Sequence, residues 1–407
     1  MLCISMVTIG ISIISRDTVM SPYIYYLTND IKTVGYISSV SGLTMFLSAL
    51  PIGYAVDKYD TKFISKITCL CGIISSAFMF MALFYDNVHL LYLAYSLFGI
   101  SSTMNITLVN SILDYSVDAV EYSVDAVEYS VDAVEYSQTY GKTRTQIYAR
   151  QFAILYMSEA IGPLFAMIVF SQTGNDWSIY MLRSVLYVGN AIYMSSFIPI
   201  LLFRHNDTVE LSKDNDTVEL SKQVMCVPYI IASSDLITAI ASGLVMEYFS
   251  LYLILEYEMD PIYVALILMS GNVSVAIVSY IGSNLIDNNP IKLMYFAIAL
   301  DAVGTIFMGL LIWKGPLSYV ICVYIVYTAC INSATPFQRS IIVDIIPKKQ
   351  RGKWNSIEHV NNFAWYASSI AGGWIINVYE FNVAFAVTCG IYIIGVIVLI
   401  IARLFLI

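Results

Sequence analysis

The sequence predicts an all-α membrane protein with about twelve transmembrane helices, arranged as two six-helix bundles. Of its 407 residues, 58% are hydrophobic and only 12% are charged, whereas a soluble globular domain is about 25% charged. Apolar runs of about 20 residues, the length that crosses a bilayer, recur along the whole chain between mostly short connections. We therefore expect lipid to surround much of the protein.

The apolar runs and the breaks between them delimit the expected spans. Their bounds are 2–27, 34–56, 64–84, 88–113, 150–171, 177–203, 228–255, 262–286, 291–313, 317–343, 354–377 and 382–405. The first run lacks a basic leader and a small-residue cleavage site, so it is interpreted as a retained helix rather than a signal peptide.

Two connections are longer and polar. The second, from Arg204 to about Val227, separates six expected spans from six more. It predicts an N-terminal bundle at 1–203, a linker at 204–227 and a C-terminal bundle at 228–407. The first carries an insertion at 114–137.

Both long connections contain tandem repeats. Residues 115–135 are three copies of YSVDAVE, and residues 206–222 hold NDTVELSK twice. Valines at heptad a and d positions allow a short acidic helix that docks a partner. The other interpretation is replication slippage in a tolerant surface loop.

Lysine and arginine favour one side of the expected bundle. The connections after even-numbered spans hold Lys58, Lys62, Lys66, Lys142, Arg144, Arg150, Arg204, Lys213, Lys222, Lys292, Lys348, Lys349, Arg351 and Lys353. The other side has little besides Lys32 and Lys314. This asymmetry predicts that both termini and the long loops are cytosolic.

Charges inside the first span are candidates for solute or proton binding, because a charge in the bilayer usually marks a pathway or a pair. Arg16 and Asp17 point about 100° apart on a helix, so one can face a central cavity while the other pairs sideways. The alternative is that the span ends early and leaves both at its rim.

Further candidates lie in later spans. Glu247 and Asp235 are acids of the seventh span, and Glu159 lies in the fifth. A buried acid can bind a proton near neutral pH, and a structural partner for Arg16 or Arg183 is the other interpretation of Glu247.

Uncharged polar residues and two other charges complete the set. Tyr95 and Asn332 can contact a solute, although packing and interhelical hydrogen bonding are the alternatives. Asp301 is expected to serve packing, and Arg183 is expected to snorkel from the outer end of the sixth span.

The loop after the second span carries the first recognisable motif. Gly53 lies one turn before Asp57, which lets a neighbouring helix approach, and Asp57 can accept hydrogen bonds from the N-terminus of another helix. The stretch GYAVDKYDTK resembles the loop signature of major facilitator superfamily carriers, G-x-x-x-D-R/K-x-G-x-R/K. Asp60 stands where a second glycine is usual.

Later stretches extend this resemblance. The loop ending in Asp287 and Lys292 is a degraded copy six spans on, Gly162-Pro163 resembles the core of the family's antiporter motif, and Arg339 to Arg351 resembles its turn between spans 10 and 11. The resemblance implies an inward gate latch in which Asp57 meets Arg351. The other gating residues are Gly53, Lys58, Lys62, Asp287, Arg339 and Asp344. Ordinary charges that anchor the interface are the alternative.

The resemblance implies a secondary carrier, active or facilitative, for a small organic solute. Tyr95 stands where many proton-coupled members have arginine, so coupling to a proton or another ion is left open. The alternative function is a non-transporting receptor or scaffold with the repeats as docking elements. We expect a monomer in a plasma or organelle membrane, without cofactor, metal, catalytic residues or nucleic-acid partner.

Overall fold

The computed structural model describes residues 18–59, 61–107, 144–195, 197–198, 226–286, 289–346 and 351–406, with the backbone alone at a few helix positions. Over these ranges all regular elements are helices, which confirms the all-α expectation there. Eight of them are long and apolar enough to cross a membrane, judged by length and composition.

The described helices of the two halves of the chain have the following bounds. The first half holds α2 (Met20–Thr28), α3 (Ile31–Lys58), α4 (Thr61–Tyr85), a helix at 88–107, α7 (Arg144–Thr173) and α8 (Ile179–Ser195). The second half holds α10 (Val227–Val245), the 3₁₀ turn η2 (Met246–Tyr248), α11 (Phe249–Tyr257), α12 (Pro261–Leu285), α13 (Pro290–Leu310), α14 (Leu317–Ile345) and α15 (Arg351–Leu404).

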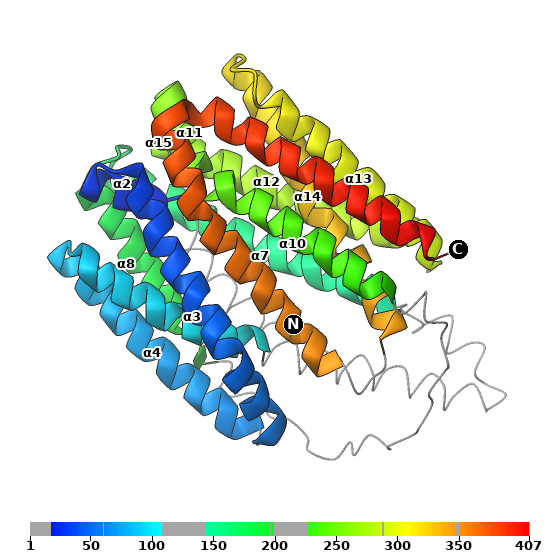
Figure 1. Ribbon diagram of the computed structural model, residues 1–407. Coiled ribbons are helices and arrows are strands. Elements are labelled where there is room, and N and C mark those ends of the chain that lie inside the picture. The colour runs from blue at the N-terminus through cyan, green and yellow to red at the C-terminus, as the bar shows by residue number, and fades with distance from the viewer. Residues whose placement is uncertain are drawn as a thin grey trace.

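The long helix α15 consists of two arms. Glu380 has φ 72° and ψ 171° inside it, and the chain reverses there, as the orange and red arms in Figure 1 show. A straight helix of 54 residues would be about 81 Å long, far more than the roughly 30 Å of a bilayer core. The two arms therefore correspond to the expected spans 354–377 and 382–405.

Each expected span from residue 34 onward overlaps a described helix. The first overlaps only through α2, because residues 1–17 lie outside the described part of the chain. The insertion at 114–137 and nearly all of the linker at 204–227 also lie outside it. The total of twelve spans and the division into two bundles therefore stay predictions.

The turns of the chain define two ends of the molecule. One end, here called the α2 end, carries the turns at 29–30, 86–87, 174–178, 258–260, 311–316 and 380. The opposite end carries the starts of α4, α7 and α10 and the end of α15 (Figure 1).

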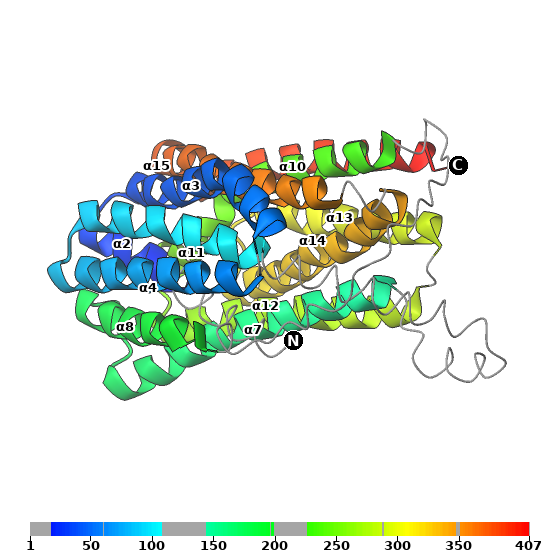
Figure 2. The same cartoon turned by 90° about the horizontal axis from the view of Figure 1, so that it is seen from below.

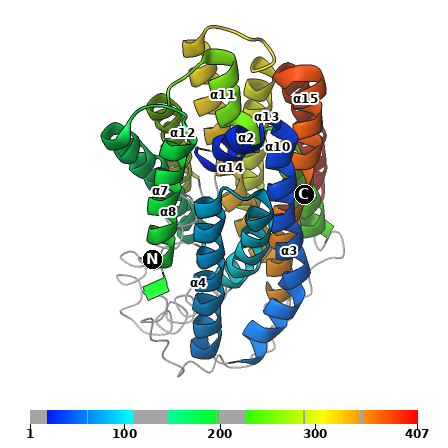
Figure 3. The same ribbon diagram turned by 90° about the vertical axis from the view of Figure 1, so that its left-hand side faces the viewer.

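Helices from the two halves of the sequence pack side by side. The first arm of α15 lies along α3, while α7 lies along α12 and also touches α14, as Figures 1 and 2 show. At the α2 end, α2 contacts α3 and α8 on one side and α11 on the other, near the middle of the view in Figure 3. One apolar core runs through both halves, and a second lies among α10, α13, α14 and α15.

Candidate functional site

The seventh expected span is interrupted where it meets helices of both halves. Helix α10 gives way to η2 and then α11, with φ −129° at Val245 and φ −109° at Tyr248. A stretch of 3₁₀ helix inside a longer helix often marks a hinge or a functional site. The break carries Glu247.

The Glu247 carboxylate receives hydrogen bonds from both halves of the chain. Its Oε2 accepts from the Ser38 hydroxyl of α3 at 3.3 Å, and its Oε1 accepts from the Trp365 indole N–H of α15 at 3.3 Å. The residue is only 4% exposed. The carboxylate thereby connects α3 and α15 through side-chain hydrogen bonds.

A second polar contact strengthens the same crossing. The Tyr248 hydroxyl donates to the Ser369 carbonyl at 2.6 Å, and the Ser369 hydroxyl donates to the Gly35 carbonyl at 3.2 Å. Tyr248, the residue after Glu247, is thereby connected through Ser369 to the backbones of both α15 and α3.

Glycines let the three helices approach closely enough for these bonds. A Cβ at Gly243 would meet the Trp365 carbonyl, one at Gly372 the Leu244 backbone, and one at Gly35 the Ser369 carbonyl. Small residues at helix crossings are what membrane proteins use to bring backbones together.

The turns at the α2 end also join the two halves. The Trp177 indole N–H donates to the Met259 carbonyl at 2.7 Å, and the Asn175 side-chain oxygen accepts from the Ile262 backbone N–H at 3.1 Å. Between them, the Ser178 side chain and backbone donate to the Asp176 carboxylate and lower its pKa.

Elsewhere at the α2 end, Lys314 pairs with Glu256. The hydrogen bond and charge of Glu256 raise the pKa of Lys314.

Contacts between the halves exist at the opposite end as well. Thr145 of α7 and Ser340 of α14 share a hydrogen bond of 2.7 Å, and the Arg339 guanidinium lies 5.4 Å from the centre of the Tyr148 ring. The Thr107 hydroxyl lies 3.0 Å from His359 Nε2. The described chain thus has contacts between halves at both ends.

A polar layer lies inside the second half. The Gln338 amide donates to the Asp301 carboxylate at 2.9 Å, which fits the packing role expected for Asp301. Nearby, Tyr327, Tyr392 and Ser242 form a chain of hydroxyl contacts of 2.6 Å and 2.7 Å. Within the described ranges no group of three potential metal ligands occurs.

The other expected binding residues that the structure describes lie on four different helices. Tyr95 is buried and packs on Phe98, and Asn332 donates to the Thr328 carbonyl of its own helix. Glu159 is buried on α7, and Asp235 is partly buried on α10. Arg16 and Asp17 lie outside the described residues.

The expected latch is only partly described. Asp287 and the side chains of Asp57, Lys62 and Arg351 lie outside the description. The ammonium group of the exposed Lys58 lies 3.2 Å from the Tyr54 hydroxyl, and Asp344 is exposed.

Nothing among the described residues lies within 4 Å of where a Cβ at Gly53 would be. Several side chains near this end of α3 lie outside the description, so the close approach at Gly53 stays a prediction.

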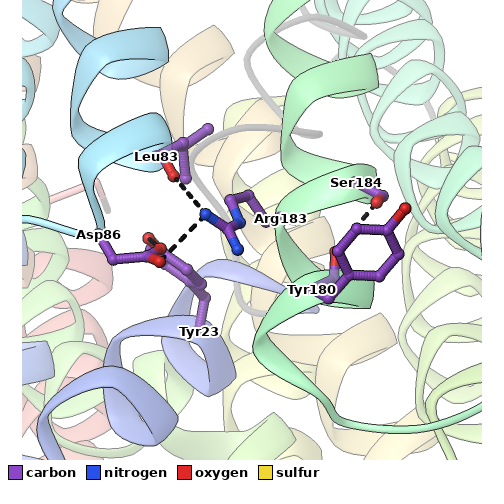
Figure 4. Close-up of polar contacts among 6 residues, drawn as sticks. All are labelled: Tyr23, Leu83, Asp86, Tyr180, Arg183 and Ser184. Carbon is purple, nitrogen blue, oxygen red and sulfur yellow. Dashed lines mark hydrogen bonds and ion pairs between the residues drawn. The ribbon is translucent and has the colours of Figure 1, made fainter.

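Arg183, which was expected to snorkel from the outer end of the sixth span, forms an ion pair with the end of another helix. Its guanidinium pairs with Asp86 at 3.0 Å and lies 3.5 Å from the Leu83 carbonyl, and Figure 4 shows it reaching from α8 to the end of α4. Asp86 also accepts from the Tyr23 hydroxyl at 2.9 Å. Arg183 therefore has its ion pair with Asp86 rather than with Glu247.

The sequence singled out Glu247 as a candidate but not the residues that bond to it. Ser38 and Trp365 carry no motif, and only their placement across from η2 makes them part of the site. Gly35 and Gly243 had a usable signal, since each is a glycine inside an expected span.

Comparisons with known proteins agree with this architecture. Residues 137–357, more than half of the chain, match the Major Facilitator Superfamily. No curated protein sequence matches the chain.

Several solved structures share the fold at low identity. The human organic anion transporter MFSD10 (TETRAN) aligns with a TM-score of 0.65 at 11% identity, over 98% of this chain and 97% of that one. The nucleoside transporter NupG gives 0.60 at 13% identity, over 98% and 97%. A bacterial homologue of the iron transporter ferroportin gives 0.61 at 12% identity in its outward-facing state, over 98% and 97%.

The apolar spans, the arrangement of the helices and the sequence match lead to one conclusion. The chain is a multi-pass integral membrane protein that belongs to the major facilitator superfamily, a family of membrane transporters.

Proposed function

We propose that this chain moves a small organic solute across a membrane by alternating access between two six-helix bundles, residues 1–203 and 228–407. The observation that carries the proposal is Glu247, a buried carboxylate in a helix break that accepts hydrogen bonds from both halves. A solute or ion that binds Glu247 competes with Ser38 and Trp365, and so weakens one connection between the halves.

The two sets of contacts between the halves act as alternating gates. The bonds of Trp177 and Asn175 close the α2 end, while Thr145 with Ser340 and Arg339 with Tyr148 close the opposite end. Opening one set while the other holds exposes the space between the bundles to one side at a time.

The remaining predicted residues take supporting roles in this proposal. Arg16, Asp17, Glu159, Asp235, Tyr95 and Asn332 contact the solute or a coupling proton. Gly53, Asp57, Lys58, Lys62, Asp287, Arg339, Asp344 and Arg351 belong to the gate at the opposite end, which faces the cytosol because lysine and arginine gather there.

The structural neighbours support this class of function. They are an organic anion transporter, a nucleoside transporter and a bacterial homologue of an iron transporter. The ferroportin homologue has been solved in outward-facing and inward-facing states, and both resemble this chain, with TM-scores of 0.61 and 0.63.

Flux measurements in proteoliposomes test the proposal. The purified chain should move at least one member of a broad panel of metabolites and drugs above empty liposomes, and Glu247→Gln should lower that flux about tenfold or more, since hydrogen bonds to a charged group are worth about 1.5–3 kcal/mol. Glu258→Gln, a change at an exposed turn of the same half, is the matched control.

Flux that is absent across the whole panel would contradict the carrier function. Equal flux in Glu247→Gln and Glu258→Gln would remove Glu247 from the mechanism but leave the carrier function standing.

The tandem repeats favour a second candidate, a receptor or scaffold on the same fold. Deleting Tyr115–Glu135 separates the two. A carrier should keep its flux without the repeats, whereas a docking protein should lose its partner in a pull-down. Retained flux together with an unchanged set of bound proteins would leave the repeats without a docking role.

A further inference from the structure

Helix α2 occupies the position where the two halves meet at the α2 end. It contacts α3 and α8 of its own half and α11 of the other half, and Figure 3 shows it near the middle of the molecule. It has only nine residues, and residues 20–24 are buried. A helix this short is not stable by itself, so its neighbours set its position.

One carboxylate connects α2 to the rest of its half. Asp86 directly follows α4 and has φ 47°, the left-handed conformation that commonly ends a helix. Its Oδ1 accepts from the Tyr23 hydroxyl of α2 at 2.9 Å, and its Oδ2 pairs with the Arg183 guanidinium of α8 at 3.0 Å. Figure 4 shows Tyr23 and Arg183 converging on Asp86.

The surroundings favour this arrangement. Tyr23 is 0% exposed, so its hydroxyl needs an acceptor inside the protein. Arg183 also lies 3.5 Å from the Leu83 carbonyl in the last turn of α4, where the helix dipole favours a cation. Hydrogen bonds to ionised partners are roughly twice as strong as those between neutral groups.

We propose that Tyr23, Asp86 and Arg183 form an anchor that positions α2. The anchor makes the end of the first span move with α4 and α8, so that this end of the molecule closes when α2 meets α11. All three are positioning residues, since they act on the gate through α2. The inference rests on the proposed alternating access, to which it adds the element that closes against α11.

Hydrogen exchange of the full chain in lipid nanodiscs tests the anchor without any solute. Tyr23→Phe keeps the ring and the Asp86–Arg183 pair but removes the bond to α2. Amide exchange in residues 20–28 should become roughly tenfold faster or more, with α4 and α8 unchanged. Asp86→Asn should speed exchange in all three helices.

Three further variants separate positioning from general destabilisation. Ser184→Ala removes a local bond to the Tyr180 carbonyl (Figure 4), touches neither α2 nor α4, and should leave exchange at parent values. Arg183→Lys keeps a cation beside Asp86 and should restore α2 protection more nearly than Arg183→Gln does.

The closing of α2 against α11 is measured by labelling a cysteine on α11. A cysteine introduced by Ile254→Cys replaces a buried residue of this helix, and its maleimide labelling should become several-fold faster when Tyr23→Phe is added. Faster exchange in every helix of Tyr23→Phe, unchanged exchange in α2, or faster exchange without faster labelling would each overturn the anchor. Failure of solute flux with these results intact would count against the carrier function alone.

Discussion

At the scale of single residues, two buried carboxylates inside the spans are bonded to neighbours on other helices. Glu247 is bonded by Ser38 and Trp365, and Asp301 by Gln338. Water does not reach a bilayer core, so such groups must find partners within the protein. Breaking such a bond therefore costs free energy unless water, a ligand or another side chain takes its place.

Gly243 should not tolerate a side chain, because a Cβ there would meet the Trp365 carbonyl of α15. Overpacking of this kind costs about 1–3 kcal/mol. Gly243→Ala should therefore lower the thermal unfolding temperature of the purified protein by several degrees.

The control for this change is Gly390→Ala. Nothing lies within 4 Å of a Cβ at Gly390, and alanine is the better helix former by about 0.5–1 kcal/mol. It should unfold at the parent temperature or above. Equal unfolding temperatures for the two variants would mean that α10 and α15 do not approach closely at Gly243.

At the scale of elements, two interruptions within long helices and the end of one short helix shape the described bundle. The break at η2 carries Glu247 at the crossing with α3 and α15. The reversal at Glu380 sends α15 back along the bundle, so that its second arm joins the core of the second half. Helix α2 ends at Thr28, because Asn29 after it adopts the left-handed conformation with φ 53°.

Trp177→Phe should loosen the α2 end. The change removes the N–H that bonds to the Met259 carbonyl while a ring can still pack on Phe170. A hydrogen bond worth about 1 kcal/mol corresponds to about a fivefold shift in the open fraction. Maleimide labelling of an Ile262→Cys probe should rise by that factor.

Trp374→Phe provides the comparison for this measurement. Trp374 is exposed, so its replacement should leave labelling of the same probe unchanged. If both tryptophan variants label at the parent rate, the Trp177 bond does not hold this end closed.

At the scale of the whole molecule, the charge asymmetry predicts which end faces the cytosol. Among described residues, Lys58, Lys292 and Arg339 lie toward the opposite end, while the α2 end carries Asp176 on an exposed turn. Lysine and arginine are retained on the cytosolic side during insertion, so the α2 end should face away from the cytosol.

Labelling of intact cells with a membrane-impermeant maleimide checks this orientation. A cysteine introduced by Asp176→Cys should react from outside, whereas one introduced by Lys292→Cys should react only after permeabilisation, with the parent chain giving the background. If the protein resides in an organelle, sealed vesicles of that membrane take the place of cells. The reverse pattern would invert the predicted orientation.

The sequence predicted the helices well because their physical cause is local. A run of about 20 apolar residues between polar turns must form a helix in lipid whatever surrounds it. The bounds of the expected spans 262–286 and 317–343 therefore differ by about two residues or fewer from those of α12 and α14. A buried acid in a span is also visible locally, which is why Glu247 was found.

The partners of these residues could not be predicted from the sequence. Ser38 and Trp365 lie far from Glu247 along the chain and have no distinguishing composition. Arg183 was expected to snorkel because of its position near the outer end of the sixth span. Nothing in the sequence indicates that Asp86 adopts a left-handed conformation and pairs with it.

The sequence by itself determined an all-helical membrane chain with candidate charges in its spans, since hydropathy and charge act on each segment separately. Only the tertiary structure decided that Glu247 is bonded from both halves and that Asp86 binds α2 and α8 together. Those properties depend on distances of about 3 Å between helices far apart in sequence, and such distances are fixed by packing of the whole bundle.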